Sequence, residues 1–151
     1  TWGQLNRSQK IRLLQIGNAE TTEEDPRERE KLRAIGAAAR MLGVRDPDPM
    51  IAATAIRAPN IQEDEVIRYC SMRNVAEEVL RVIALNRDWT KSYLVKLNLV
   101  KNPKTPFAFA AKFVQHLRDN DVKGLTRSKD VSGAVQNAAK QQLSRKTPGK
   151  H

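Results

Sequence analysis

The two side chains best suited to nucleophilic or metal chemistry are Cys70 and His116, because a thiolate and an imidazole can form a nucleophile with its base or a pair of metal ligands. Cys70 is the only cysteine of the chain, and His116 is its only internal histidine. Neither has a second metal ligand at a suitable spacing, and the sequence has no glycine-rich phosphate loop and no HExxH or GxSxG motif. We therefore expect no catalytic residue, no metal site and no cofactor.

A carboxylate followed by an aromatic residue, Asp88-Trp89, suggests a different chemistry. Enzymes that excise a nucleic-acid base need a carboxylate beside an exposed base and side chains that stack on it. The pair also has a simpler interpretation, in which Asp88 caps a helix and Trp89, one turn before Tyr93, is buried between helices. We favour this structural interpretation and predict that the protein is not an enzyme.

Basic residues gather in the second half of the chain. Residues 87–151 contain no glutamate and only four aspartates, so the whole formal net charge of +10 is C-terminal. Such a region attracts phosphates, acidic lipid or an acidic protein, or it is simply a solvated surface. Lysine outnumbers arginine in it, which favours diffuse attraction over bidentate recognition of bases or phosphates. The predicted partner-binding residues are Arg87, Lys91, Lys96, Lys101, Lys104 and Lys112.

Acidic residues precede this region in two clusters. The first, residues 63–65, follows Asn60, and the second, residues 77–78, follows Asn74, so the first turns of two successive helices would carry matching negative charge. Compensation of the helix dipoles explains such charges by itself. Lys91 stands at the equivalent place in the next unit, where its charge is unfavourable for the dipole. The surface is therefore expected to change from acidic to basic along the chain.

Polar cap-type residues recur at intervals of about 14 residues, and each is followed by about ten residues with the apolar spacing of a helix. A helix of that length is too short to be stable alone in water, so it must pack on its neighbours. The aromatic fraction of 5% also suits close packing of short helices. The sequence therefore predicts an all-α fold of short antiparallel helices, stacked as a HEAT-like α-solenoid. The proposed caps are Asp48, Asn60, Asn74, Asp88, Thr105, Asp119 and Asp130.

Two further helices are predicted before the repeats. Ser8 would cap a first helix that stops at Gly17, and a polar, acidic linker over residues 18–30 would lead into a second helix that starts at Pro26 and stops near Leu42. An apolar stripe follows one face of the second helix, at Leu32, Ile35, Ala38 or Ala39, and Leu42. A solvated face is expected from Arg27, Arg29, Arg33 and Arg40.

The length of 151 residues suits one domain with a real core. In it, the N-terminal helices with their acidic linker (residues 1–46) pack with the helical-repeat region (residues 47–144), and residues 145–151 form a disordered basic tail. No apolar run approaches the roughly 20 residues of a membrane span. The single cysteine and the absence of a signal peptide favour a cytoplasmic protein.

A resemblance supports the repeat interpretation. The stretch VLRVIALNRDWTKSYLVKLNLVKNPKTPFAFAAKFV resembles a group of uncharacterised HEAT-like helical-repeat proteins of myxobacteria and related bacteria. It extends over roughly residues 49–143 and implies a cytoplasmic bacterial helical-repeat protein, with no biochemical activity and no catalytic residue attached. The matching positions are Asn86, Arg87, Trp89, Tyr93, Asn102, Pro103, Lys104 and Thr105.

Two functions agree with these features. The first is a non-enzymatic helical-repeat module that mediates a protein-protein interaction with an acidic partner along its stacked surface. The alternative is binding of the nucleic-acid backbone by the basic C-terminal half. A groove lined by Trp89, Tyr93 or Phe107 would favour the protein partner, whereas a continuous stripe of Lys and Arg would favour phosphate. The oligomeric state cannot be predicted from these patterns.

Overall fold

The computed structural model describes residues 1–146, and this part of the chain is all-α, as predicted, with no β-strand. Within the same residues, no helix combines the length and the apolar character that crossing a membrane requires. Three short 3-10 helices are present, η1 (Trp2–Gln4), η2 (Gly17–Thr21) and η3 (Trp89–Lys91). The described residues form nine α-helices: α1 (Arg7–Ile16), α2 (Pro26–Gly43), α3 (Pro49–Ile56), α4 (Glu63–Ser71), α5 (Glu77–Leu85), α6 (Tyr93–Lys101), α7 (Phe107–Val114), α8 (Asp119–Arg127) and α9 (Gly133–Lys146).

Two helix starts follow the predicted chemistry directly. The Asp25 carboxylate accepts a hydrogen bond from the backbone N–H of Arg27 at 3.0 Å, and Asp48 accepts one from Met50 at 3.0 Å. Each aspartate precedes a proline at the first helical position, where the missing N–H costs nothing. The start of α1 differs, because its N-cap is Asn6, two residues before the predicted Ser8.

Several other predicted caps lie before the true N-cap. Helices α4 and α5 follow Gln62 and Ala76, each two residues after the predicted caps Asn60 and Asn74. The N-cap of α7 is Pro106, directly after Thr105. Asp119 is itself the first residue of α8, after the N-cap Arg118, and Asp130 precedes α9 by three residues.

Buried turn residues explain this offset. Val75, Thr105 and Val131 each stand just before the residue that leads into a helix, and all three are buried. The chain is extended at Ala76 and Pro106, with ψ of 143° and 134°, so it directs the preceding side chain into the core before the helix begins. Asn74 and Asp130, which are earlier in their turns, therefore remain outside the helices that follow, and at α7 the predicted cap Thr105 is itself the buried residue.

Asp88 does not act as a side-chain cap either. It precedes η3 without a capping hydrogen bond, and the amide oxygen of Asn86 instead accepts from the backbone N–H of Trp89 at 3.0 Å. Helix α6 starts at Tyr93, four residues after Trp89. Its N-cap is Ser92, whose hydroxyl accepts a hydrogen bond from the Val95 N–H at 3.4 Å. Trp89 is only partly buried against the core, less than the sequence predicts.

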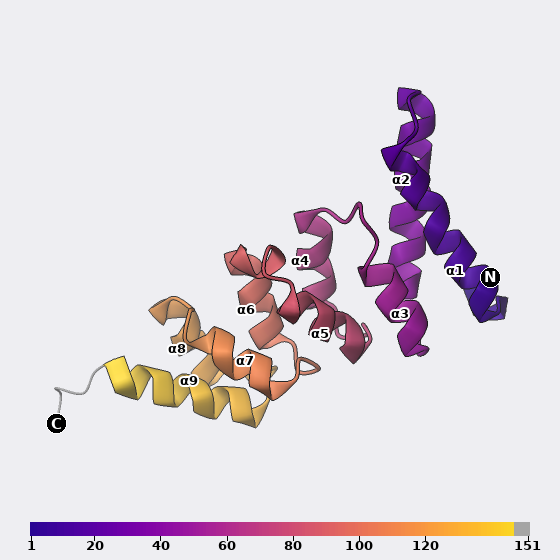
Figure 1. The fold of residues 1–151 in the computed structure, drawn as a ribbon. Coiled ribbons are helices and arrows are strands. Elements are labelled where there is room, and N and C mark those ends of the chain that lie inside the picture. Colours follow the sequence, from indigo (N-terminus) through magenta and orange to yellow (C-terminus); the bar gives the residue numbers. More distant parts are fainter. Residues whose placement is uncertain (147–151) are drawn as a thin grey trace.

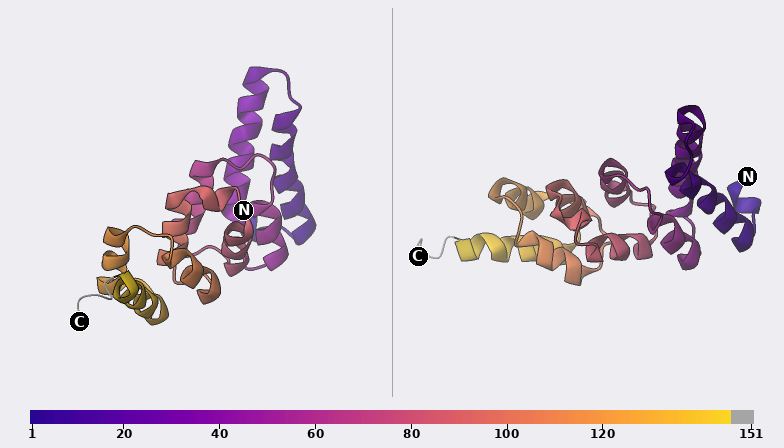
Figure 2. Two further views of the ribbon diagram at one scale, coloured as in Figure 1. Left: turned by 60° about the vertical axis from the view of Figure 1, so that its left-hand side comes forward. Right: turned by 45° about the horizontal axis from the view of Figure 1, so that its top comes forward.

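Packing follows the order of the helices along the chain. Helix α3 packs on α5, α4 on α6, and α7 on α9, while α6–α7 and α8–α9 also pack as consecutive pairs. The right-hand view of Figure 2 shows α4, α6 and α8 in one row above α5, α7 and α9. The pair α1–α2 stands at the opposite end from α9, and the upper part of α2 projects beyond the other helices (Figure 1). One cluster of buried apolar residues runs through the assembly from Leu14 to Ala139.

The C-terminal helix continues further than expected. Helix α9 extends through Ser144 and Arg145 to Lys146, positions that the sequence analysis assigns to the repeat end and the disordered tail. The stretch before Pro148 contains good helix formers and no breaker, which explains the extension. The rest of the predicted tail, residues 147–151, lies outside the described residues.

Asn102 ties the end of α6 to the end of α4. It is 4% exposed, and its side-chain N–H2 donates to the backbone carbonyls of Cys70 and Met72, both at 2.8 Å. These carbonyls belong to the end of α4, where the helix leaves backbone acceptors without intrahelical partners. The Asn102 oxygen also accepts from Lys104 N–H at 3.0 Å, which shapes the α6–α7 turn.

We expect Asn102→Asp to lower the free energy of unfolding by about 2 kcal/mol, because a carboxylate cannot donate to the two carbonyls. Urea denaturation followed by circular dichroism measures this difference. Asn98→Asp is the matched control, since Asn98 donates only one longer hydrogen bond, to Ile67 O at 3.3 Å. An equal loss in the two variants would contradict a special role for Asn102.

The face that α2 buries shares only Ala39 with the predicted apolar stripe. Its buried residues are Gly36, Ala39, Arg40 and Gly43, whereas Ile35 is 45% and Leu42 38% exposed. Glycines set this choice: a Cβ built on Gly17 would lie 2.4 Å from the Cα of Gly36, so only glycine allows the two backbones to meet there. The first part of the predicted linker is the helix η2, which packs on α2.

Candidate functional site

The six predicted partner-binding residues are spread over five successive segments of the chain. Arg87 lies in the turn between α5 and η3, Lys91 in η3, Lys96 and Lys101 in α6, Lys104 in the α6–α7 turn and Lys112 in α7. All are exposed except Lys96, which is partly buried. The Lys91 ammonium lies 3.5 Å from the Asp88 carboxylate in a largely exposed pair, which is a weak interaction in water.

Lys101 and Lys104 border different hollows. Lys101 lines a small hollow of about 130 Å³ together with Arg73 and the turn after α4. The Lys104 ammonium donates to the Val75 carbonyl at 3.2 Å and borders a larger hollow against α5. These two neighbouring lysines therefore do not line one common hollow.

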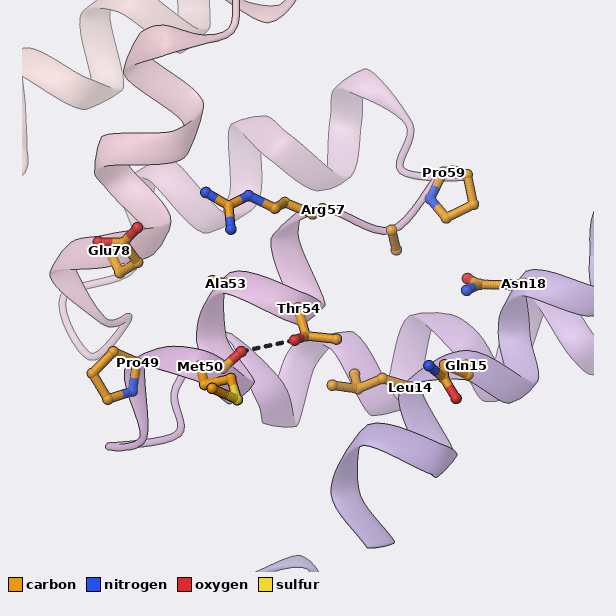
Figure 3. Close-up of a pocket in the computed structure, with 11 residues that line it drawn as sticks. Leu14, Gln15, Asn18, Pro49, Met50, Ala53, Thr54, Arg57, Pro59 and Glu78 are labelled. Atoms are coloured by element: carbon orange, nitrogen blue, oxygen red, sulfur yellow. Dashed lines mark hydrogen bonds between the residues drawn. The ribbon is translucent and has the colours of Figure 1, made fainter. Parts of the chain in front are cut away.

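The larger surface feature is a groove that consists of two adjoining hollows. The first, of about 540 Å³, lies between α1, α3 and the start of α5, with Leu14, Met50 and Ala53 providing apolar surface (Figure 3). Figure 3 shows Arg57 and Glu78 at one side of this hollow and Gln15 and Asn18 at the other. The floor is apolar and the rim is polar, an arrangement typical of surfaces that receive a peptide chain.

The second hollow continues the first. It measures about 520 Å³ and shares Pro49 and Glu78 with its neighbour. Residues from the α2–α3 turn and the α4–α5 turn line it, and Lys104 reaches it from the α6–α7 turn. We call the two hollows together the α3–α5 groove. Its lining residues come from segments as far apart in the chain as α1 and the α6–α7 turn, and the direct packing of α3 on α5 helps to bring them together.

Three cations border the α3–α5 groove without an acidic partner among residues 1–146. They are Arg45, which donates to the Met41 carbonyl at 3.0 Å, Arg57, and Lys104. The other cation of the groove, Arg81, lies 2.9 Å from Glu77 and 3.8 Å from Glu78. Glu77 and Glu78 therefore share Arg81, and Asp46, the third carboxylate of the groove, lies 2.6 Å from the Lys10 ammonium. The groove thus carries four cations against three carboxylates.

A buried ion pair lies outside the groove, between α2 and α4. Arg40 is 3% exposed and donates to the two carboxylate oxygens of Glu65 at 2.6 and 3.1 Å, and the Tyr69 hydroxyl donates to the same carboxylate at 2.5 Å. Burial and the hydrogen bond to Glu65 both raise the pKa of Tyr69. Burial lowers the pKa of Arg40, but the hydrogen bonds and charge of Glu65 outweigh it, so the net shift is upward.

This pair corrects two predictions. Arg40 is not part of a solvated face, and Glu65 is not a surface charge at the start of a helix. Since every charge in the pair is matched and hydrogen-bonded, its role is to join α2 to α4. A hollow of about 500 Å³ lies beside this ion pair. Its lining includes a second pair, in which Arg33 donates to the Glu20 carboxylate at 2.7 Å.

The residues that could carry chemistry are not brought together. Cys70 is completely buried, and burial raises the pKa of its thiol to about 12, which makes it a poor nucleophile at neutral pH. His116 is exposed after the end of α7. Residues 1–146 contain no cluster of three or more His, Cys, Asp or Glu side chains arranged to hold a metal ion. The absence of enzymatic activity stays a prediction.

Comparison of the chain with protein-family models, with curated proteins and with solved structures finds no match.

The sequence analysis identified Lys104 but missed Arg57. Lys104 stands in a run of lysines, whereas Arg57 follows the apolar helix PMIAATAI and has no basic neighbour. The signal that points to Arg57 is positional. It is the C-cap of α3, and α3 lies next to α5 only in the folded chain.

Proposed function

We propose that this protein is a non-enzymatic helical-repeat module, a HEAT-like α-solenoid, that binds an acidic segment of a partner protein in the α3–α5 groove. The observation that carries the proposal is the groove itself, in which an apolar floor beside Arg57 continues into a second hollow bordered by Arg45 and Lys104. An extended acidic peptide with a few apolar anchors complements both properties.

The packing of the helices supports the solenoid part of the proposal. Helices two apart in the chain pack on each other at α3–α5, α4–α6 and α7–α9, which is the pattern of stacked hairpins. Recurrence of the buried turn position at Val75, Thr105 and Val131 supports it further, because a repeat reuses its turns. The resemblance to HEAT-like bacterial proteins, which implies a cytoplasmic location, agrees with this interpretation.

Nucleic-acid backbone binding by the C-terminal half is the second candidate. It is favoured by the charge of residues 87–151. It is less well supported by the geometry, since Lys91 is paired with Asp88 and the hollows at Lys101 and Lys104 are different ones. The protein-binding proposal uses the apolar floor as well as the charge, so we prefer it.

Reversing two groove charges tests the proposal. The probe is a fluorescein-labelled peptide in which glutamates alternate with leucines and prolines, and fluorescence anisotropy measures its affinity. We expect Arg57→Glu combined with Lys104→Glu to weaken binding by about tenfold or more, mainly through slower association. Both side chains lie at the surface, so the fold should be retained.

The matched control carries the same change of charge outside the groove, in Lys91→Glu combined with Lys112→Glu. Equal weakening in the two double variants would mean that only net charge attracts the peptide, and the proposal would be abandoned. Tighter binding of unrelated duplex DNA than of the peptide, with a log-log salt slope that falls by about 0.9 for each lysine removed, would favour the nucleic-acid function instead.

A further inference from the structure

Helices α1 and α2 form an antiparallel pair held by small residues. Gly17 meets Gly36, while a Cβ built on Gly43 would approach the Leu14 side chain at 3.2 Å. The start of the pair is closed by Lys10, whose ammonium lies 2.6 Å from the buried Asp46 carboxylate. As residue numbers rise along α1, those of the contacting residues on α2 fall, which fixes the antiparallel direction.

One side of this pair carries apolar side chains from both helices. Successive residues of an α-helix are rotated by about 100° around its axis. In two antiparallel helices, the residues directly before the two contacting residues therefore point to the same side of the pair. Leu13 and Ile16 precede Leu14 and Gly17. Ile35 and Leu42 precede Gly36 and Gly43, so all four side chains share one side, which we call the outer flank.

The opposite side of the pair is already occupied. Arg40 leaves α2 on that side to reach Glu65 in α4, and Gln15 and Asn18 face the hollow beside α3. The outer flank therefore faces away from α3 and α4. Its four large apolar side chains are 36 to 45% exposed, so more than a third of each remains accessible to solvent.

A hollow lies at one end of the outer flank. It measures about 410 Å³ and is lined by Trp2, Lys10, Leu42 and Arg45, among others. The Trp2 ring is held in place because its indole N–H donates to Asp46 at 2.9 Å and the Lys10 ammonium lies over the ring. The apolar outer flank thus leads to a hollow with a fixed aromatic wall. This hollow can receive one large side chain of a partner.

We propose that the outer flank docks an amphipathic helix of a partner protein whose apolar stripe is bordered by acidic residues. The charges around the flank select such a helix. Arg12, one turn before Ile16, and Arg45, three residues after Leu42, have no acidic partner among the described residues. Glu28 lies about two turns before Ile35 and is bonded to Lys31 at 3.2 Å, so it does not offset these cations.

A second copy of the chain is a poor occupant for the same reason. Two outer flanks facing each other would bring Arg12 and Arg45 of both copies into one interface with no acid to balance them, and like charges brought together disfavour an interface. An acidic helix completes a three-helix arrangement with α1 and α2 and matches their cations. This site is separate from the α3–α5 groove except for Arg45, which borders both.

The experiment uses the full chain and two synthetic helices of about 18 residues, the length of α2. Both have leucines on one face; one carries glutamates beside this stripe and the other carries lysines. Fluorescence anisotropy should show binding of the glutamate peptide, and Ile35→Asp should weaken it by about tenfold or more. Amide shifts in an NMR titration should concentrate at residues 13, 16, 35 and 42.

Leu85→Asp is the matched control, because Leu85 is 65% exposed at the end of α5, away from the flank. Unchanged binding in this variant and in the Arg57→Glu, Lys104→Glu variant supports docking on the outer flank. Equal binding of the two peptides, or equal loss in Leu85→Asp, overturns the proposal. Binding lost only when the groove is changed overturns it in favour of the groove. Self-association of the unmixed chain that Ile35→Asp abolishes identifies a second copy as the occupant and also overturns it.

Discussion

Glu65→Leu is expected to lower the free energy of unfolding by about 3–5 kcal/mol, because it leaves the Arg40 guanidinium buried without a counter-ion. The arginine would lose both of its charge-assisted hydrogen bonds, and the Tyr69 hydroxyl would lose its acceptor. Urea denaturation of the variant and the wild-type chain, followed by circular dichroism at 25 °C, measures the difference.

Two further variants separate the ion pair from other effects of the substitution. Glu63→Leu changes an exposed carboxylate in the same first turn of α4 and should alter stability by less than about 0.5 kcal/mol. Arg40→Met combined with Glu65→Leu removes both charges and should recover most of the lost stability. If the single and double variants were equally unstable, packing rather than charge would be responsible.

Gly17→Ala should cost about 3 kcal/mol, since the new methyl group would overlap the backbone of α2 and force the α1–α2 pair apart. Its Cβ would lie 2.4 Å from the Cα of Gly36, an atom that cannot rotate away as a side chain can. Thermal and urea denaturation both report the loss. Near-ultraviolet circular dichroism in a Trp89→Phe background, where Trp2 is the single tryptophan, reports whether the pair has separated.

Gly124→Ala is expected to stabilise the protein, in contrast to Gly17→Ala. Gly124 lies inside α8 with no heavy atom within 4 Å of a built Cβ, so alanine should stabilise the helix by about 0.5–1 kcal/mol. A stabilising effect of Gly17→Ala would show that the close approach of α1 and α2 is not essential to the fold.

Local chemistry in the sequence predicts the all-α fold and the helix starts at Asp25 and Asp48, because cap and proline act within one turn. The same local chemistry predicts the wrong N-cap at Asn60 and Asn74, because asparagine is favoured in turns as well as at helix caps. Burial of Val75 after Asn74 decides the outcome, and burial depends on neighbours that are distant in the chain.

The candidate sites were less predictable than the helices. Arg40 is one of several arginines on α2, and only the approach of Glu65 from α4 makes it the buried one. The stripe at Ile35 and Leu42 has helical periodicity, but periodicity does not show which face is covered within the chain. The α3–α5 groove joins Arg57 and Lys104 across three helices, a relation that no short-range pattern contains.

The order of packing also bears on how the chain opens. The main contacts of each described helix are with helices one or two places away, so few native pairings require distant parts of the chain to meet. Loop closure is then inexpensive at each step of assembly, and short-range topology of this kind favours rapid folding. An end of the row can therefore detach, as α9 would on losing α7 and α8, while the opposite end keeps its own contacts and remains folded.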